Sequence, residues 1–208
     1  METAEITCNL ESETDNTEIV PVSDYRHLIQ ILTEYGVPIE QWTFGQIFEL
    51  AQLIQIGDTR LASRKNKLLQ LKEGVNINVF SPTNESILLE QRRDRYNVKD
   101  ELVETKSTQG YSLSIGETKK QGETFKESAI RGLQEELGIE EITGLEYANT
   151  YNFTKLLTRT PGLPAEYTIK EYNYTIPEHY YNPEGYEVIE PDTAYMRIPL
   201  SWEPVENF

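Results

Sequence analysis

The chain has 208 residues, a length that suits one main domain with an appendage. Its 35 acidic residues outnumber its 19 basic residues, and the formal net charge of -16 argues against a broad binding surface for nucleic acid or an anionic membrane. The single cysteine, Cys8, excludes an intramolecular disulfide, so a reducing cytoplasm is the expected location. No stretch of the sequence approaches the roughly 18 consecutive apolar residues of a membrane-spanning helix.

The first 20 residues are acidic and carry few large apolar side chains. They contain no Lys or Arg to balance the charge, and they offer little apolar surface to offset the entropy lost on ordering. Residues 1–20 therefore predict a disordered acidic tail, whose acidic residues are Glu2, Glu5, Glu11, Glu13, Asp15 and Glu18.

The next segment, residues 21–72, predicts a helical extension. Ser23 is a suitable N-cap for a helix whose apolar residues recur at helical spacing up to Gly36. A second helical run ends at Gly57, and residues 59–71 combine leucines with mixed charge. We expect this whole segment to form a helical lead-in packed on the main domain, which takes residues 73–208.

Strand patterns dominate the main domain. Alternating apolar residues, or clusters of β-branched and aromatic residues, predict strands at 75–79, 87–91, 111–115, 142–157, 167–176 and 195–200. Two polar stretches between them, residues 92–109 and 183–190, predict connecting loops.

One helix interrupts these strands, over residues 124–137, and Gly138 ends it. Its apolar side comprises Phe125, Ala129, Ile130, Leu133 and Leu137. Because successive helical residues turn by about 100 degrees, Glu127, Arg131 and Glu135 form a stripe, and Glu136 lies beside the apolar side. One edge of this helix therefore concentrates carboxylates.

Clustered carboxylates are unfavourable unless a cation neutralises them, and their oxygens are the hard ligands that Mg²⁺ or Mn²⁺ prefers. Such a cation can offset charge on phosphate oxygens and help to activate water. The alternative is that the charged residues of this helix form only a salt-bridged face turned to solvent, which is the usual arrangement at these spacings in an isolated helix.

The segment from Gly116 to Ile139 resembles the Nudix box, G-x5-E-x7-R-E-U-x-E-E-x-G-U, where U is a bulky aliphatic residue. The matching residues are Glu123, Arg131, Leu133, Glu135, Glu136, Gly138 and Ile139. Outside the box, residues 36–42, 57–61, 161–167 and 183–186 resemble a Nudix-related group with this helical extension. The resemblance implies an α/β fold, in the form of a Nudix-type α/β/α sandwich with a mixed β-sheet.

The resemblance also implies the chemistry of the box. Glu135 and Glu136 are the implied principal ligands for Mg²⁺ or Mn²⁺, Arg131 orients Glu135, and Glu123 completes the implied catalytic set. A backbone carbonyl from the turn before the helix often completes the metal shell in the family, and here Gly116 or its neighbour Ile115 is the candidate.

Two basic residues are candidates for binding the substrate. Arg92 and Arg93 follow the strand at residues 87–91, which the resemblance brings near the substrate cleft, where they could pair with phosphates. The alternative is that they are counter-charges for a very acidic surface.

The sequence departs from the box in two places. Gly132 stands where the pattern has the glutamate of its Arg-Glu pair, and glycine costs roughly 1 kcal/mol in a helix interior relative to alanine. Six residues, rather than five, separate Gly116 from Glu123. A carboxylate from a later segment could compensate for Gly132, the candidates being Glu166, Glu171, Glu184, Glu187 and Glu190.

Two functions remain open at this level. The first is a metal-dependent hydrolase that cleaves the pyrophosphate bond of a nucleoside diphosphate linked to another moiety. The second is a catalytically degenerate Nudix-like module that binds a ligand or regulates a partner, as Gly132 and the altered turn suggest. The expected partner is a small nucleotide or other pyrophosphate compound rather than nucleic acid or membrane, and a homodimer is compatible with either function.

Overall fold

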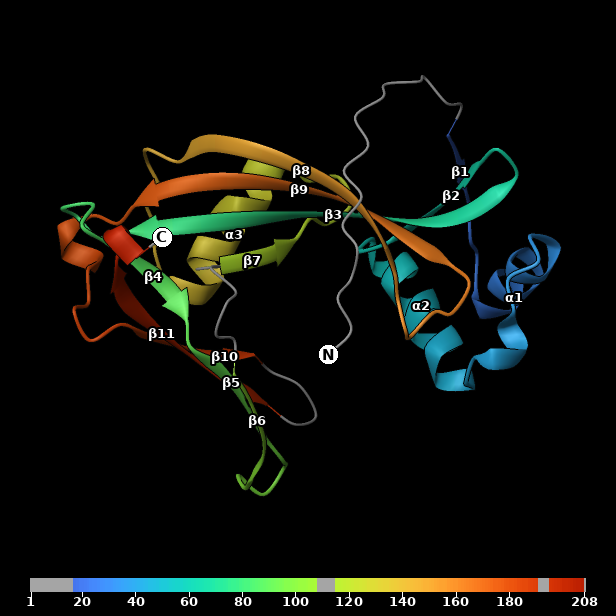
Figure 1. Cartoon of the computed structure of the whole chain (residues 1–208), viewed down its shortest axis with the longest axis horizontal. Helices are drawn as coiled ribbons and strands as arrows, with labels where there is room; N and C mark the ends of the chain where they lie inside the picture. Colours follow the sequence, from blue (N-terminus) through green and yellow to red (C-terminus); the bar gives the residue numbers. More distant parts are fainter. Residues whose placement is uncertain (1–16, 108–114, 191–194, 208) are drawn as a thin grey trace. The chain divides into compact units, whose positions relative to one another are not determined.

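The computed structural model describes residues 17–107, 115–190 and 195–207 (Figure 1). These residues divide into two compact units. Unit 1 comprises the described residues up to Gly74, together with Thr118–Glu123 and Thr150–Ile169. Unit 2 comprises the remaining described residues. Among all of them, no helix is long and apolar enough to cross a membrane.

Unit 1 combines helices with the beginning of the sheet. Its helices are α1 (Tyr25–Glu34), η1 (Ile39–Gln41) and α2 (Phe44–Ile56). Its sheet follows the order β1 (Glu18–Val20), β2 (Arg60–Arg64) and β3 (Lys67–Phe80), with both pairings antiparallel. The helices bury their apolar sides in one cluster, which contains Leu28, Ile31, Leu32, Val37, Trp42, Ile47, Leu50, Leu61, Leu68 and Leu163.

Two predictions for this segment are wrong in detail. The N-cap of α1 is Asp24 rather than Ser23, because the Asp24 carboxylate accepts hydrogen bonds from the backbone N–H groups of Arg26 and His27 at 2.8 and 2.9 Å. The residues at 59–71 form strands rather than helix. Lys65 and Asn66 both have positive φ angles, which close a tight hairpin between β2 and β3.

The predicted tail also ends earlier than residue 20. Residues 1–16 lie outside the described part of the chain, whereas Glu18–Val20 pair with Leu61–Ser63 as strand β1. Backbone pairing to β2 stabilises these three residues, and Val20 also packs against the apolar cluster of unit 1.

Unit 2 contains most of the sheet and one α-helix, α3 (Phe125–Leu137). From the second half of β3, the strand order is β4 (Ser86–Glu90), β11 (Met196–Pro204), β5 (Arg92–Tyr96) and β6 (Leu102–Ser107). Three further strands lie partly in unit 2, namely β7 (Ile115–Thr118), β8 (Glu146–Leu156) and β9 (Pro164–Thr175). Strand β7 pairs with β3, and β9 pairs with both β3 and β8. The remaining elements are η2 (Glu178–Tyr180), β10 (Tyr186–Glu190), which pairs with β11, and η3 (Val205–Asn207).

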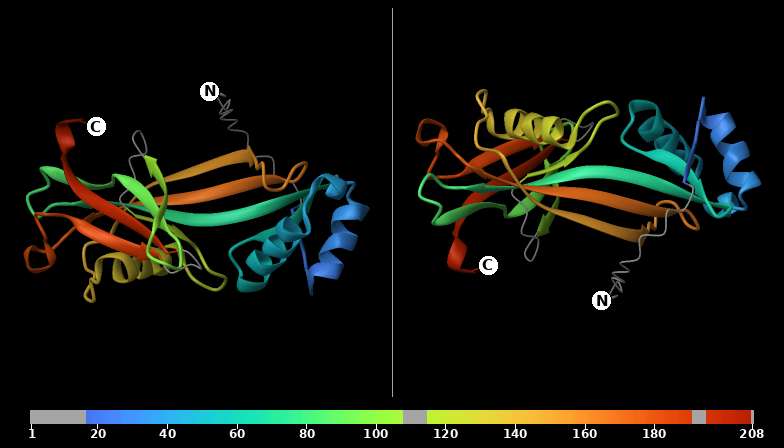
Figure 2. Two further views of the ribbon diagram at one scale, coloured as in Figure 1. Left: turned by 90° about the horizontal axis from the view of Figure 1, so that it is seen from below. Right: turned by 90° about the horizontal axis from the view of Figure 1, so that it is seen from above.

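The core of unit 2 lies between α3 and the strands. Figure 2 shows α3, in yellow, along one face of these strands. The helix contributes Ala129, Leu133 and Leu137 to a buried cluster. Its other buried members include Val75, Ile77, Val79, Leu88, Ile115, Ile139, Tyr172, Tyr174, Ile176, Val188, Ile198 and Leu200. The predicted α/β class and the position of the box helix are therefore confirmed.

The predicted strands at 75–79, 87–91, 142–157, 167–176 and 195–200 correspond to β3, β4, β8, β9 and β11. The strand predicted at 111–115 lies largely outside the described residues, and β7 begins at Ile115.

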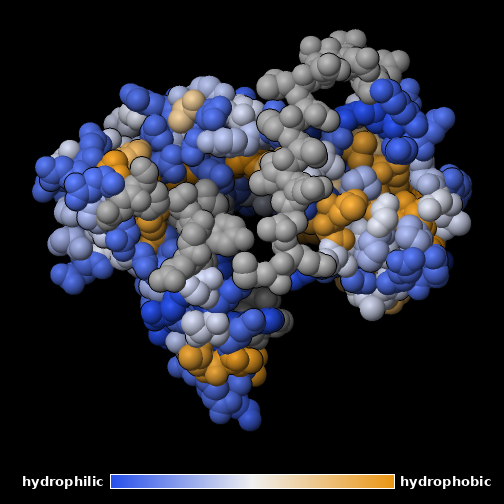
Figure 3. All heavy atoms as spheres, in the orientation of Figure 1, coloured by the Kyte–Doolittle hydropathy of each residue, from blue (hydrophilic) through white to orange (hydrophobic). Residues whose placement is uncertain are grey.

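The loop predicted over 92–109 is wrong for its described part. Residues 92–107 form the antiparallel hairpin of β5 and β6. Both strands carry many charged residues and are largely exposed. The loop predicted at 183–190 likewise contains β10. On the face seen in Figure 3, hydrophobic residues gather over this β5–β6 hairpin, where Val98, Leu102 and Val103 are exposed.

Two glycines with positive φ provide a matched test of the packing in unit 2. Around Gly138, at φ 67, no heavy atom lies within 4 Å of the place that a Cβ would occupy, whereas a Cβ on Gly185, at φ 87, would collide with the backbone carbonyl of Leu200. Gly138→Ala should therefore destabilise by only the roughly 1–2 kcal/mol of a left-handed backbone. Gly185→Ala should destabilise by clearly more, as measured by urea unfolding. Equal losses for the two variants would contradict the close approach at Gly185.

Candidate functional site

The box helix α3 begins at a reciprocal hydrogen-bonded cap. The Thr124 hydroxyl accepts from the backbone N–H of Glu127 at 3.2 Å, and the Glu127 carboxylate accepts from the backbone N–H of Thr124 at 2.6 Å. Glu127, which the helical stripe grouped with Arg131 and Glu135, therefore caps the helix. Gly138 ends α3 in the left-handed conformation, as the sequence predicted.

Arg131 brings two carboxylates to one nitrogen. Its Nη1 lies 2.6 Å from an oxygen of Glu117 on β7 and 3.2 Å from an oxygen of Glu135, one helical turn further along α3. The side chains of Arg131 and Glu117 are 16% and 18% exposed, whereas that of Glu135 is 55% exposed. Arg131 thus connects a shielded carboxylate to a solvent-accessible one.

Glu117 is a residue that the sequence reasoning missed. Side chains two positions apart on a strand point to the same face, so Glu117 accompanies Ile115, whose side chain is buried against α3. The Ile-Gly-Glu order of residues 115–117 carries this signal, but the pattern of the box points to the backbone of Gly116 instead.

Gly132 faces β7 with no room for a side chain. A Cβ at this position would lie 2.7 Å from Cγ of Glu117, 3.3 Å from Cγ2 of Ile115 and 3.5 Å from Cδ1 of Ile77. Gly132 is itself buried. The glycine that the sequence marks as a departure from the box is therefore where α3 and β7 approach each other closely, and the helix accepts its conformational cost for that reason.

Three further residues of the box, Glu136, Glu123 and Gly116, were predicted to belong to the site. Glu136 follows Glu135 on α3 and is half-buried. The Glu123 carboxylate accepts a hydrogen bond from the backbone N–H of Lys120 at 3.0 Å and so closes the turn before the helix. Gly116 lies in β7. The metal-binding roles of Glu136 and the Gly116 carbonyl, and the catalytic role of Glu123, stay predictions.

The donor set suits a cation that is shared with a substrate. In the described parts of the chain, no three His, Cys, Asp or Glu side chains form a group that could hold a metal ion by themselves. However, Mg²⁺ usually keeps several waters and takes one or two protein carboxylates together with substrate phosphates. Glu135, whose side chain is 55% exposed, is a carboxylate of the kind that such a cation takes, with Glu136 next to it in the sequence.

Arg92 and Arg93, the predicted phosphate ligands, both contact carboxylates. Nε of Arg92 donates to Asp94 at 2.7 Å, and Arg93 donates to both oxygens of Glu90, at 2.7 and 2.8 Å. These pairs agree with the interpretation of both arginines as counter-charges. Phosphate binding by either arginine stays a prediction.

Two of the carboxylates considered as replacements for Gly132 are also engaged elsewhere. Glu166 accepts from Nη1 of Arg64 at 2.7 Å, and Glu171 accepts from the side-chain amide of Asn78 at 3.0 Å.

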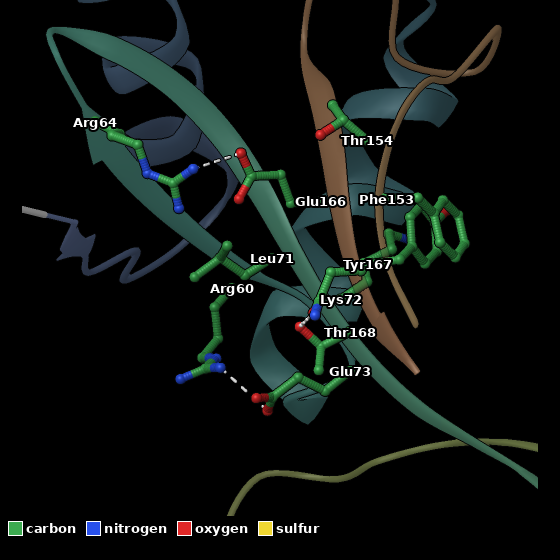
Figure 4. Close-up of a pocket in the computed structure, with 11 residues that line it drawn as sticks. Arg60, Arg64, Leu71, Lys72, Glu73, Phe153, Thr154, Glu166, Tyr167 and Thr168 are labelled. Atoms are coloured by element: carbon green, nitrogen blue, oxygen red, sulfur yellow. Dashed lines mark hydrogen bonds and ion pairs between the residues drawn. The ribbon is translucent and has the colours of Figure 1, made fainter. Parts of the chain in front are cut away.

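Unit 1 contains a polar hollow of about 560 Å³. Figure 4 shows Arg64 directed at Glu166 and Arg60 at Glu73, pairs joined at 2.7 and 3.0 Å. The rings of Phe153 and Tyr167 stack with their centroids 4.9 Å apart. Each arginine of the hollow is therefore paired with a glutamate beside it, and Lys72 adds a third cationic side chain to the lining.

The hydrogen bonds at Asp94 provide a pH-dependent test of the β5–β6 hairpin. Asp94 is 6% exposed, and hydrogen bonds from Arg92 and Thr105 lower the pKa of its carboxyl below the ordinary value of 3.8. A lowered pKa in the folded state stabilises the protein above the unfolded-state value, and this stabilisation is lost as the pH falls through the folded-state value. Asp94→Asn should therefore be less stable than the wild type at pH 7, and the difference should shrink in urea unfolding below about pH 4. The exposed Glu104→Gln variant is the control, and a difference for Asp94→Asn that grows on acidification would contradict the assignment.

The chain was compared with known protein families, curated proteins and solved structures. No sequence model of a known protein family matches the chain, and no curated protein matches it. The fold is similar to that of the mutator MutT protein from Bacillus halodurans, with 16% identity and a TM-score of 0.40 over 65% of this chain and 69% of that chain. It is also similar to the Nudix domain of Shewanella oneidensis NrtR, crystallised with ADP-ribose, with 12% identity and a TM-score of 0.33 over 65% of this chain and 73% of that chain. Each likeness covers about two thirds of this chain at low sequence identity.

Proposed function

We propose that this protein hydrolyses the pyrophosphate bond of a nucleoside diphosphate linked to another moiety, with the help of Mg²⁺ or Mn²⁺. The observation that carries the proposal is the ion pair of Arg131 with Glu135 at 3.2 Å, which holds a solvent-accessible carboxylate beside Glu136 at the end of α3. An accessible carboxylate, with a half-buried one next to it in the sequence, is a suitable binding place for a hard divalent cation and a phosphate-bearing substrate.

Each residue has a distinct part in this proposal. Glu135 and Glu136 bind the cation, which supplies charge stabilisation to phosphate oxygens and acidifies a bound water when present. Arg131 orients Glu135 and reduces repulsion between the neighbouring carboxylates. Its own orientation is restrained because the guanidinium also contacts Glu117 and, at 3.5 Å, the hydroxyl of Ser128.

The second candidate function is a catalytically degenerate binding or regulatory module. The observation that favours it is the buried glycine at position 132, which leaves α3 without one carboxylate of the box pattern. Such a module would bind a nucleotide without turning it over.

Hydrolysis of a defined panel separates the two functions. Dinucleotides, nucleotide sugars, ADP-ribose and nucleoside triphosphates should be assayed with Mg²⁺ or Mn²⁺, with detection of the released phosphates. We expect turnover of at least one diphosphate-linked compound, which Glu136→Gln and Glu135→Gln each reduce by about 100-fold or more, since they remove charge stabilisation of the transition state.

The exposed acid Glu140, just after α3, provides the matched control, and Glu140→Gln should retain wild-type turnover. Ligand-induced thermal stabilisation without any turnover would instead identify the binding module. Turnover that survives Glu136→Gln unchanged would remove Glu136 from the mechanism.

A further inference from the structure

We propose that the polar hollow of unit 1 binds a small molecule that carries more than one phosphate group. The hollow has a volume of about 560 Å³, within the range of about 300–1,000 Å³ that is usual for small-molecule sites. All the residues that line it belong to unit 1, whereas the acids of α3 belong to unit 2. The inference therefore does not depend on the proposed function.

Cationic side chains outnumber acidic ones around the hollow. The charged residues of its lining are Arg60, Arg64, Lys72, Glu73 and Glu166. The carboxylate of Glu73 is shared, because Nη2 of Arg60 and Nζ of Lys119 both lie 3.0 Å from its Oε2. One carboxylate thus balances two cations, and the hollow keeps an excess of positive charge in a chain whose net charge is -16.

The glutamates leave some donors of both arginines available. Nη1 of Arg64 donates to Glu166 at 2.7 Å, and its Nε donates to the Thr17 hydroxyl at 2.8 Å. Within the described residues, no hydrogen bond takes up Nη2 of Arg64 or the guanidinium of Arg60, whose contact with Glu73 is an ion pair. A guanidinium has five N–H donors, so a glutamate can position each arginine while the other donors bind phosphate oxygens.

Lys72 is a second sign of unbalanced positive charge. Its side chain is half-buried, and it forms no ion pair with a carboxylate in the part of the chain that the structure describes. Burial lowers the pKa of its ammonium group below the ordinary value of 10.5, although the acids Asp58 and Glu49 act in the opposite direction. An anion in the hollow would supply the negative charge that these acids do not.

The spacing of the two arginines indicates an extended ligand. Arg60 and Arg64 are four residues apart on β2, so their Cα atoms are about 13 Å apart and their side chains leave the same face of the strand. In Figure 4 the two guanidinium groups point to different glutamates. A single phosphate group therefore suits one arginine, whereas a chain of phosphate groups can approach both.

The competing explanation is that the two ion pairs only join β2 to β3 and β9. Half-exposed ion pairs of this kind contribute little to stability. On this explanation, the loss of either arginine has no counterpart in anion binding, because the net charge of the chain disfavours anions. A measurable affinity for a polyanion must then come from a local group of cations.

The experiment measures the binding of inorganic tripolyphosphate to the full-length protein by calorimetry. EDTA is present, so that no divalent cation connects the ligand to other carboxylates. The affinity should rise in the order phosphate, pyrophosphate, tripolyphosphate. Arg60→Gln and Arg64→Gln should each weaken tripolyphosphate binding by about 10-fold or more, since each removes hydrogen bonds between charged groups. Urea unfolding checks that both variants fold.

Two variants provide matched controls. Arg26→Gln removes the same charge from an exposed position on α1, and Glu136→Gln alters the candidate site on α3. Both should bind tripolyphosphate with wild-type affinity. Arg64→Lys keeps the charge but not the planar group of donors, so it should lose less affinity than Arg64→Gln.

ATP is titrated beside tripolyphosphate to identify the source of the phosphate groups. A higher affinity for ATP supports a nucleotide as the ligand. An equal or lower affinity supports the phosphate chain as the part that is bound.

Three results would overturn the inference: wild-type protein that binds no tripolyphosphate, wild-type affinity in either Arg60→Gln or Arg64→Gln, or a hollow that binds the neutral sugar glucose in place of polyphosphate. Because the titration contains no divalent cation, each of these results leaves the proposed hydrolysis unaffected. Absence of hydrolysis in the substrate panel would likewise leave this binding site unaffected.

Discussion

The close approach of α3 to β7 at Gly132 is the constraint on which the candidate site depends. With a glycine at this position, the helix backbone lies close enough to the strand for Ile115 and Ile77 to pack against it. The same approach directs the Glu117 side chain across the helix surface toward Arg131. A larger residue at 132 would force either the helix or Glu117 to move, and the arrangement of charges at the edge of α3 would change with it.

Arg131 provides the positive charge that pairs with the acids at this contact between α3 and β7. It lies between a shielded glutamate on the strand and an exposed glutamate on the helix, and it neutralises part of a strongly acidic edge. The chain has a net charge of -16, so acidic side chains repel one another in the folded state. Arg131 reduces this repulsion between the acids that it contacts. The arrangement is consistent with either a hydrolase or a binding module, since a cation held by these acids would attract a phosphate-bearing ligand in both.

The sequence predicted those features that depend on local pattern. The limits of α3 followed from Thr124 and Gly138, and the strands β3, β4, β8, β9 and β11 followed from alternation and composition. The hairpin of β2 and β3 was missed because a tight turn with positive φ at Lys65 and Asn66 lacks the glycine that commonly marks one. The hairpin of β5 and β6 was missed because its strands are charged and exposed, so no apolar alternation marks them.

The role of Gly132 could not be predicted either, and here the reason is that it depends on tertiary packing. From the sequence, a glycine within a helix is a missing carboxylate with a conformational cost. Only the tertiary packing shows that the side chain of Glu117, fifteen residues earlier and on a different element, lies against the helix at this glycine. A crystal structure with Mn²⁺, located by its anomalous scattering, tests the proposed cation site most directly. We expect an ion within about 2.0–2.6 Å of a carboxylate oxygen of Glu135 or Glu136. Crystals that hold no ion beside these two residues, or hold it at another place in the chain, would contradict the proposal.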